Sequence, residues 1–261
     1  MTSLAPLFEL LAPRAAASAL HGLRLLPTAL LCPFLGGPLV PGVVRLSLAF
    51  GLGACAWSAA GEPPFTGSGR DLLLAGAREL ALGTALGLLA AVPFEAARAG
   101  GRLVDTLRGA TLTELHVAPL RQRESASGDL LVQLLVVLAA NAGGNRLVVA
   151  ALLETFRAVP AGAGVAPAVL LGAGLRGAAE ILACAFALGA PAAAGVLAAD
   201  LSISLALRGS RLPIAFAAQP TRAALGILAL ALPAAAIGGR LTSAVALSAG
   251  LIRAASAGKL P

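Results

Sequence analysis

The chain has no tyrosine, and its one tryptophan is Trp57. Many membrane helices are positioned by belts of Trp and Tyr at the two interfaces, so this chain has no such belt to place its helices. Aromatic platforms for stacking nucleic-acid bases are equally missing, and the arginines are scattered through apolar sequence. The pI near 11.1 therefore does not indicate a nucleic-acid partner.

Histidine and cysteine are also scarce, with two and three residues among 261. His21 and His116 are isolated, and no CxxC spacing links Cys32, Cys55 and Cys184. The sequence offers no metal site and predicts that the cysteines are small buried core residues. Neither a nucleotide cradle nor a nucleophile with a histidine partner is recognisable. We therefore expect no cofactor and no enzymatic activity.

Charged residues are only 12% of the chain, whereas hydrophobic residues are 58% and the mean hydropathy is +0.90. Soluble domains have about 45–50% apolar and about 25% charged residues, so the composition predicts an integral membrane protein. The apolar runs are continuous rather than alternating, which favours helices over a barrel. We predict an all-α polytopic membrane protein of broken helices and helical hairpins. It forms one membrane domain over residues 1–261, without a separate soluble domain.

Acidic residues end at Asp200, and the basic residues that follow are Arg208, Arg211, Arg222, Arg240, Arg253 and Lys259. Because cytoplasmic segments of membrane proteins are enriched in Lys and Arg, this asymmetry predicts a cytoplasmic C-terminus. The N-terminus shows no clear signal-peptide pattern, so we expect the first helices to direct insertion.

Apolar runs in the first part of the chain cover residues 15–35, 42–60 and 71–97. The first run contains Pro27 and Pro33, which predict a kinked helix. Residues 112–128 are polar by comparison and predict an exposed connection that includes Ser125 and Gly128.

The apolar run 130–140 would extend only about 17 Å as a helix, too short for a hydrocarbon core about 30 Å thick. Gly143 and Gly144 follow in the turn NAGGN, and Asn145 is expected to cap an amphipathic helix over 146–159. Two short helices joined by glycines predict a hairpin that enters the apolar layer and returns, or one that packs against other subunits. One long helix bent at the glycines is the alternative.

The last third of the chain has apolar runs over 164–190, from Pro191 to about Leu207, and over 223–251. Arg176 and Glu180 interrupt the first of these. Because a lone charge is costly in lipid, we expect them to pair with each other or to face protein or water. Hydropathy alone predicts roughly six or seven membrane spans.

The most distinctive stretch, residues 93–111, reads PFEAARAGGRLVDTLRGAT. As a helix it places Glu95, Arg98, Arg102 and Asp105 on one face, where opposite charges are i,i+3 neighbours that partly neutralise one another. Arg108 is a further i,i+3 neighbour of Asp105, the pair 100–101 permits close approach of another backbone, and Gly109 is a candidate helix end. A plainer alternative is that these arginines mark the headgroup end of a membrane helix.

This stretch resembles the hallmark sequence of the FliR/SpaR/SctT family, the export-apparatus membrane proteins of flagella and type III secretion systems. The matching residues are Pro93, Phe94, Ala96, Ala99, Gly100, Asp105, Arg108, Gly109 and Ala110. Further blocks that resemble the family follow the same order: Arg24, Pro27, Pro33, Pro41 and Arg45, then GGN with a helix closed by Pro160, then Asp200, Arg208, Pro213, Phe216, Pro220 and Arg222. Ile214 departs from the family, where Gln is usual, which puts a specific polar contact there in doubt, and Arg222 stands where Lys is common.

The resemblance implies a core export-gate subunit in the bacterial inner membrane, within the basal body of a secretion system, closer to the virulence-type SctT branch than to flagellar FliR. It implies SctR-like and SctS-like subunits as partners, an SctU-like subunit beside them, unfolded secreted proteins in transit, and membrane lipid. Nucleic acid is not among the implied partners. The candidate assembly or gate residues are Pro93, Phe94, Gly100, Arg102, Asp105, Arg108, Gly109, Gly143, Gly144, Asp200, Arg208 and Pro213.

Two other classes of function stay open on sequence grounds. A small-molecule or ion transporter would line its path with Arg98, Arg102, Asp105, Arg176, Glu180 and Asp200, although no inverted repeat is evident. A membrane enzyme such as a phosphotransferase would need clustered acids to hold a metal. Only Asp105 lies near the central arginines, which disfavours that class.

Overall fold

The computed structural model describes residues 5–36, 40–107, 125–209 and 234–257, and these are almost entirely helical, with no strand among them. The elements are α1 (Ala5–Leu31), the short 3₁₀ helix η1 (Pro33–Leu35), α2 (Gly42–Ala60), α3 (Gly69–Leu107), α5 (Ala126–Asn141), α6 (Gly144–Ala158), α7 (Pro167–Gly209) and α9 (Ala234–Ser256). The predicted all-α class of a polytopic membrane protein is thus confirmed.

Two compact units make up the chain. The first unit comprises Met1–Val92, Gly143–Ala178 and Val245–Pro261, and the second comprises Pro93–Ala142 and Ala179–Ala244. Both α3 and α7 run from one unit into the other. Each unit is built from segments distant in sequence, so its core forms only when those segments pack together.

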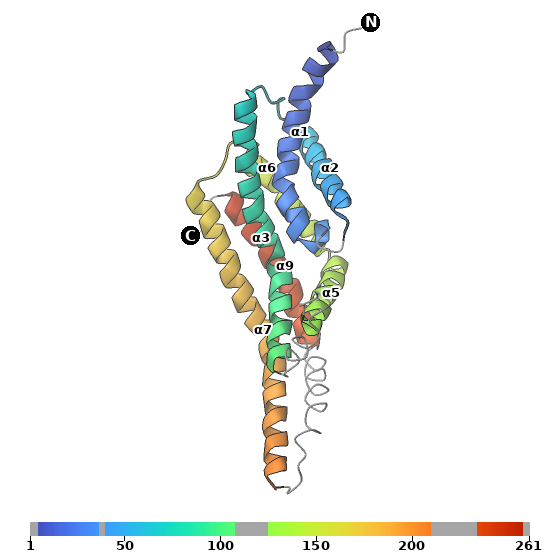
Figure 1. Cartoon of the computed structure of the whole chain (residues 1–261), viewed down its shortest axis with the longest axis vertical. Helices are drawn as coiled ribbons and strands as arrows, with labels where there is room; N and C mark the ends of the chain where they lie inside the picture. Colours follow the sequence, from blue (N-terminus) through green and yellow to red (C-terminus); the bar gives the residue numbers. More distant parts are fainter. Residues whose placement is uncertain (1–4, 37–39, 108–124, 210–233, 258–261) are drawn as a thin grey trace, which may run out of the picture. The chain divides into compact units, whose positions relative to one another are not determined.

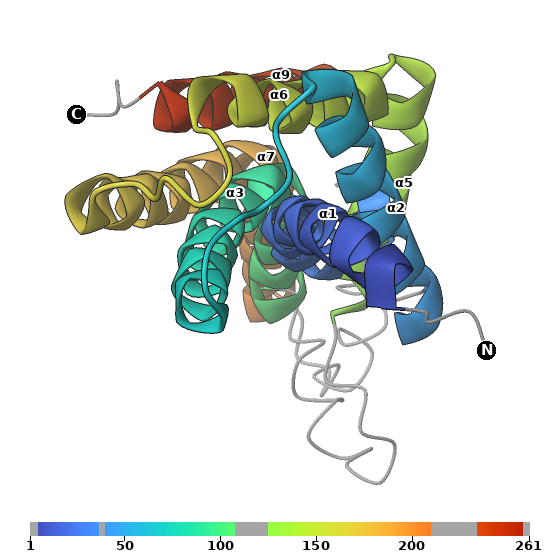
Figure 2. The same ribbon diagram turned by 90° about the horizontal axis from the view of Figure 1, so that it is seen from above.

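In the first unit, α1 lies between α2 and the N-terminal half of α3 (Figures 1 and 2). Small residues permit these close crossings. A Cβ atom at Gly53 of α2 would lie 2.4 Å from the backbone nitrogen of Gly22 in α1, and one at Gly83 of α3 would lie 2.2 Å from the carbonyl oxygen of Arg24. Backbone therefore packs against backbone on both sides of α1.

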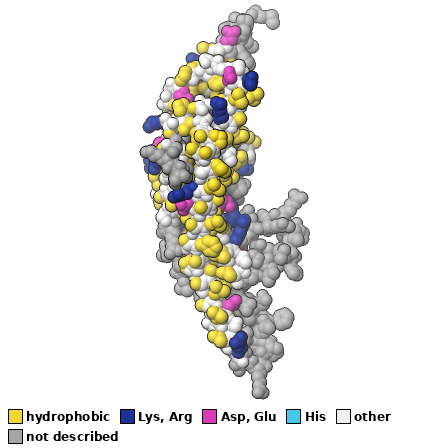
Figure 3. Space-filling view, turned by 90° about the vertical axis from the view of Figure 1, so that its left-hand side faces the viewer, with side chains coloured by type: hydrophobic (Ala, Val, Ile, Leu, Met, Phe, Trp, Pro, Cys, Tyr) yellow, Lys and Arg dark blue, Asp and Glu magenta, His cyan; other side chains and the backbone are white. Residues whose placement is uncertain are grey.

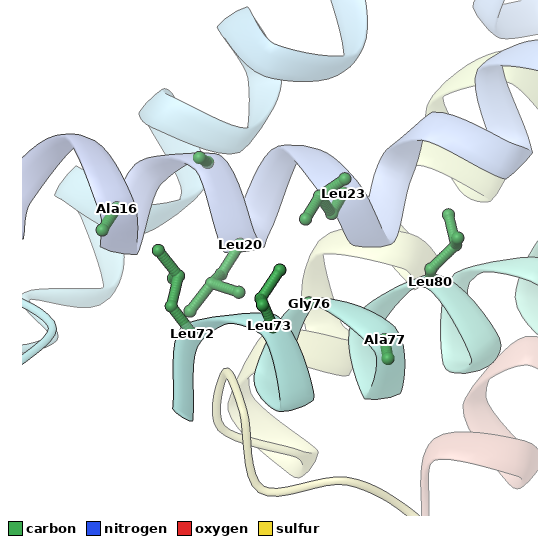
Figure 4. Close-up of a pocket in the computed structure, with 9 residues that line it drawn as sticks. Ala16, Leu20, Leu23, Leu72, Leu73, Gly76, Ala77 and Leu80 are labelled. Carbon is green, nitrogen blue, oxygen red and sulfur yellow. The ribbon is translucent and has the colours of Figure 1, made fainter. Parts of the chain in front are cut away.

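A shallow groove remains where α1 and α3 diverge, and its volume is about 330 Å³. Leu20 and Leu23 of α1 face Leu72 and Leu73 of α3 across it, with Gly76 at its base (Figure 4). Its lining side chains are all hydrocarbon, so it has no group that would select a polar ligand.

The surface agrees with a membrane environment. Hydrophobic side chains are spread over much of the described part of the face in Figure 3, and the few charged side chains lie among them. Large side chains of α7 are among the exposed ones, including Leu171 (67% exposed), Leu201 (65%) and Leu205 (66%). In water such a surface would be unfavourable, whereas lipid or neighbouring subunits accommodate it.

By length and composition, three described helical stretches can cross a membrane: Gly42–Ala60, Gly69–Leu107 and Pro167–Leu205. The pair α5 and α6, bent at its break, gives up to a fourth. Within the described residues this is fewer than the six or seven that hydropathy predicts for the whole chain, of which the run 223–251 is described only from residue 234. Residues 71–97 and 93–107 lie in one helix, α3, and residues 108–111 fall outside the described residues. The runs on both sides of Pro191 likewise lie in one helix, α7, so separate apolar runs do not each form a span.

Three local predictions are wrong. Pro191 does not divide two helices, because α7 continues through it, and the φ angle that a proline ring imposes is compatible with a helix. Gly143, not Asn145, is the N-cap of α6, since its φ of 77° gives the left-handed turn that a residue without Cβ adopts easily. Finally, Ser125 and Gly128 are buried instead of lying in an exposed connection, while residues 112–124 of that predicted connection fall outside the described residues.

The cysteine prediction holds for one residue and fails for another. Cys32 is fully buried after α1, and burial raises the pKa of its thiol to about 11. Cys55, by contrast, is exposed on α2, and Cys184 is intermediate. Whether a cysteine is buried depends on which face of its helix it occupies. Apolar neighbours in the sequence do not identify that face.

Candidate functional site

Asp105 lies near the C-terminal end of α3, where its carboxylate meets the first turn of α5. The residue is 1% exposed and accepts hydrogen bonds from Ser127 Oγ (2.6 Å), from the Ser127 backbone N–H (3.1 Å) and from Ser125 Oγ. Ser125 is the N-cap of α5, and its Oγ also accepts a hydrogen bond from the backbone N–H of Gly128 at 3.0 Å. We call Asp105, Ser125 and Ser127 the Asp105 clasp.

The Asp105 clasp places a buried negative charge at the positive end of a helix dipole. The first N–H groups of a helix have no partner within the helix, and carboxylates stabilise them both electrostatically and by hydrogen bonding. Asp105 accepts from one such N–H and orients the serine that caps the helix. The clasp thereby ties the end of α3 to the start of α5.

Glycines bring the same two helices into contact. A Cβ atom at Gly101 of α3 would lie 2.3 Å from the backbone nitrogen of Gly128 in α5, closer than real Cβ contacts. On another side of α3, a Cβ atom at Gly100 would lie 3.0 Å from the carbonyl oxygen of Ala185, and one at Gly189 would lie 3.0 Å from the carbonyl oxygen of Gly100. The predicted close approach of backbone at Gly100 and Gly101 is confirmed.

The charged face of the central stretch is only partly paired as the spacing predicts. Arg98 Nη1 donates to Glu95 Oε1 at 2.5 Å, which confirms that i,i+3 pair. Arg102 is exposed, and none of the ion pairs in the described segments includes it. Asp105 uses serines of another helix, and its predicted neighbour Arg108 falls outside the described residues.

A second cluster of buried charge lies in the first unit. Arg24 of α1 is fully buried and donates two hydrogen bonds to Glu79 of α3, from Nε to Oε2 at 2.6 Å and from Nη2 to Oε1 at 3.0 Å. Its Nη1 donates to the carbonyl oxygens of Thr155 (3.1 Å) and Val159 (2.8 Å) at the C-terminal end of α6. The backbone N–H of Gly162 donates to Glu79 Oε1 at 2.7 Å. One ion pair therefore joins α1, α3, α6 and the loop after α6.

Aromatic contacts complete this cluster. The guanidinium carbon of Arg24 lies 4.3 Å from the centroid of the Phe156 ring, a cation–π distance. The ring of His21, one helical turn before Arg24, stacks on Phe156 with centroids 4.6 Å apart, and its Nδ1 lies 2.9 Å from the carbonyl oxygen of Ala17. We call Arg24, Glu79 and Phe156 the Arg24 cluster.

A comparison with known protein families assigns the chain. The family model described as "Bacterial export proteins, family 1" matches residues 15–247, which is most of the sequence. The chain belongs to this family. Both the Asp105 clasp and the Arg24 cluster lie within the matched residues.

A relative of this export protein is known from Salmonella typhimurium strain LT2, the "Secretion system apparatus protein SsaT". The two sequences are 36% identical over 84 residues, which is 32% of each chain. The match thus spans about a third of that relative. As a member of the family with helices apolar enough to cross a bilayer, the chain is a multi-pass protein of the bacterial inner membrane.

The other candidate residues of the export protein are spread over both units. Pro93 and Phe94 are buried inside α3, and Gly143 and Gly144 form the turn into α6. Asp200 is partly buried and Arg208 exposed in the C-terminal half of α7. Gly109 and Pro213 lie outside the described residues, as does Arg108.

Sequence reasoning did not single out the partners in either cluster. Glu79 lies within the apolar run 71–97, and Ser125 and Ser127 lie within the polar segment 112–128 that predicts an exposed connection. The sequence contains one indication of the Arg24 cluster. Arg24 and Glu79 are ionisable residues within apolar runs, and such residues need a partner. The serines carried the usual signature of a helix N-cap, but nothing local tied them to Asp105.

Proposed function

We propose that the chain is a core export-gate subunit of a type III protein secretion system. With SctR-like and SctS-like subunits it forms the channel by which unfolded proteins cross the inner membrane, and an SctU-like subunit lies beside it. The family match supports an export role, and the name of the Salmonella relative supports a secretion apparatus, in keeping with the SctT branch. Its role is structural, with no catalytic step of its own.

The observation that carries this proposal is the Asp105 clasp within the most family-specific stretch. A buried carboxylate that receives three hydrogen bonds holds its helix ends in one geometry, as a subunit interface requires. Arg102 remains exposed one turn before Asp105, where it is available to a neighbouring subunit. We infer that Asp105 positions α3 for assembly and that Arg102 contributes to the contact.

A transporter is less well supported by the geometry. Among the charges that would line a substrate path, Arg98 is paired with Glu95 and Asp105 is engaged by serines. The Arg24–Glu79 pair is at most 1% exposed and satisfies backbone groups as well. Charges held in this way stabilise packing and leave little capacity for a solute.

Co-purification tests the proposed function. The chain is expressed with and without candidate SctR-like and SctS-like neighbours, extracted in mild detergent, and analysed for mass and subunit composition. We expect a defined hetero-oligomer, and we expect less of it from Asp105→Asn than from a control, Thr106→Ala, which changes the adjacent exposed residue. A solitary or self-associating protein that ignores these neighbours, and that moves a solute across liposomes, would refute the export gate in favour of a transporter.

A further inference from the structure

A groove of about 410 Å³ lies between α2 and α6 in the first unit. Leu52, Ala56 and Ala59 form its α2 wall, while Ala150 and Leu153 come from α6. Glu154 and Arg157 also line it, so this groove combines an apolar floor with a charged edge. The groove between α1 and α3 has no such edge.

The charged edge is basic on balance. The charge of Glu154 is neutralised by an ion pair, because its Oε2 accepts a hydrogen bond from Arg253 Nε of α9 at 2.7 Å. Arg157 is exposed, and no ion pair within the described ranges includes it. Arg146 is also exposed and lies eleven positions earlier in α6. Eleven residues are about three turns of 3.6 residues each, so the two arginines share one face of the helix. The edge therefore favours an anionic group.

The dimensions of the groove favour a slender occupant. One turn of helix about 10–12 Å wide and about 5.4 Å long fills roughly 400–600 Å³, so the groove holds no more than a single turn. An extended hydrocarbon chain fits the same volume along its length. The α2 wall belongs to a candidate membrane span that is only 17% buried in the protein, which places it where acyl chains are abundant.

We propose that the groove between α2 and α6 binds an anionic phospholipid, with an acyl chain against α2 and the phosphate at Arg157. Basic groups between membrane helices recognise anionic headgroups by charge, and an apolar helix face retains the chain. This site does not depend on the export-gate proposal, because it lies within one unit of this chain.

Trp57 provides a reporter near the groove, since it is the one tryptophan of the chain and precedes Ala60, a lining residue, by about one helical turn. The full chain is reconstituted in vesicles of phosphatidylglycerol and phosphatidylcholine in equal amounts, with dibrominated acyl chains on either the anionic or the zwitterionic lipid. Bulk lipid quenches Trp57 fluorescence equally in both preparations. If the groove selects the anionic lipid, quenching is stronger in the preparation whose phosphatidylglycerol carries the bromines. We expect brominated phosphatidylglycerol to have an apparent affinity about five-fold higher, the factor that one arginine near a membrane surface gives.

Two variants and a matched control locate the effect. Arg157→Gln should reduce the preference to nearly one-fold, whereas Arg14→Gln, which removes the same charge from an exposed residue of α1, should leave it unchanged. Ala56→Leu fills the groove without changing charge and should also reduce the preference. Equal quenching by both lipids in the unchanged chain, or a preference that survives both Arg157→Gln and Ala56→Leu, would overturn the proposal. So would loss of quenching by either lipid when a partner subunit is co-reconstituted, since the groove would then be a protein interface.

Discussion

At the scale of single residues, the Arg24 cluster shows how this chain tolerates charge inside an apolar unit. Arg24 and Glu79 neutralise each other through two hydrogen bonds, and their remaining hydrogen-bonding groups meet backbone atoms of α6 and of the loop after it. A buried pair of this kind is weak evidence for net stability, but removal of one partner leaves an uncompensated buried charge. The two residues are therefore coupled.

The prediction is that Arg24→Met lowers the free energy of unfolding by about 3–5 kcal/mol, because Glu79 then remains buried without its counter-charge. Glu79→Gln should cost less, and the double variant should cost less than the sum of the two. Chemical denaturation of the purified protein in detergent measures each value. The exposed pair Arg253–Glu154 is the control, since its side chains are 46% and 49% exposed and Arg253→Met should cost no more than about 1 kcal/mol. Additive effects at Arg24 and Glu79 would contradict the coupling.

The Asp105 clasp allows a residue-scale prediction that is separate from assembly. Asp105→Asn removes the charge and presents amide N–H groups to serine donors, so we expect the free energy of unfolding to fall by about 1–3 kcal/mol. Ser127→Ala should have a smaller effect because Ser125 and the backbone N–H of residue 127 still bind the carboxylate. Circular dichroism during denaturation reports both, with Thr106→Ala as the exposed neighbour. Wild-type stability in Asp105→Asn would show that the clasp contributes nothing to folding.

At the scale of elements, helix contacts in the first unit depend on glycine at particular crossings. We predict that Gly83→Ala strongly destabilises the protein, because the new Cβ would lie 2.2 Å from the carbonyl oxygen of Arg24 and would separate α1 from α3. Gly51→Ala is the matched control within α2, since nothing lies within 4 Å of its Cβ position. Helix propensity alone should make that variant more stable by up to about 1 kcal/mol.

Thermal unfolding in detergent compares these two variants under identical conditions. We expect the unfolding midpoint to fall for Gly83→Ala and to rise for Gly51→Ala, since both residues are helical glycines and only Gly83 has backbone against its Cβ position. Similar midpoints for Gly83→Ala and Gly51→Ala would mean that α1 and α3 do not pack through this crossing.

At the scale of the whole molecule, the described helices divide into those suited to lipid and those that are not. α2 exposes large apolar side chains such as Leu46, which is 47% exposed, whereas α6 exposes arginines opposite its buried face. We predict that, in intact membranes, a membrane-impermeant maleimide labels a single cysteine at Arg146→Cys but not one at Leu46→Cys, both on a cysteine-free background. Labelling of both after solubilisation in detergent is the control. Rapid labelling of Leu46→Cys in intact membranes would remove α2 from the set of spans.

The class of molecule and its family follow from local features of the sequence. Composition and continuous apolar runs can be read directly from the sequence. Because the backbone in lipid must satisfy its own hydrogen bonds, long apolar runs of this kind form helices. The stretch 93–111 likewise carried its own evidence, including the helix through Asp105, the pair Glu95–Arg98 and the close approach at Gly101. The helix and the ion pair depend on residues a few positions apart, whereas the sequence indicates only that Gly101 permits a close approach and not that Gly128 makes it.

The pairing of buried polar groups, by contrast, depends on how the helices pack in three dimensions. Arg24 and Glu79 are 55 positions apart, and Asp105 and Ser127 are 22 apart, so helical spacing gives no information about either contact. The spacing predicts Arg102 as a neighbour of Asp105, yet α5 brings serines to the carboxylate. A buried polar group forms hydrogen bonds with whichever groups the packing of helices places beside it. That packing depends on contacts between backbones distant in sequence, such as the crossing of Gly83 and Arg24.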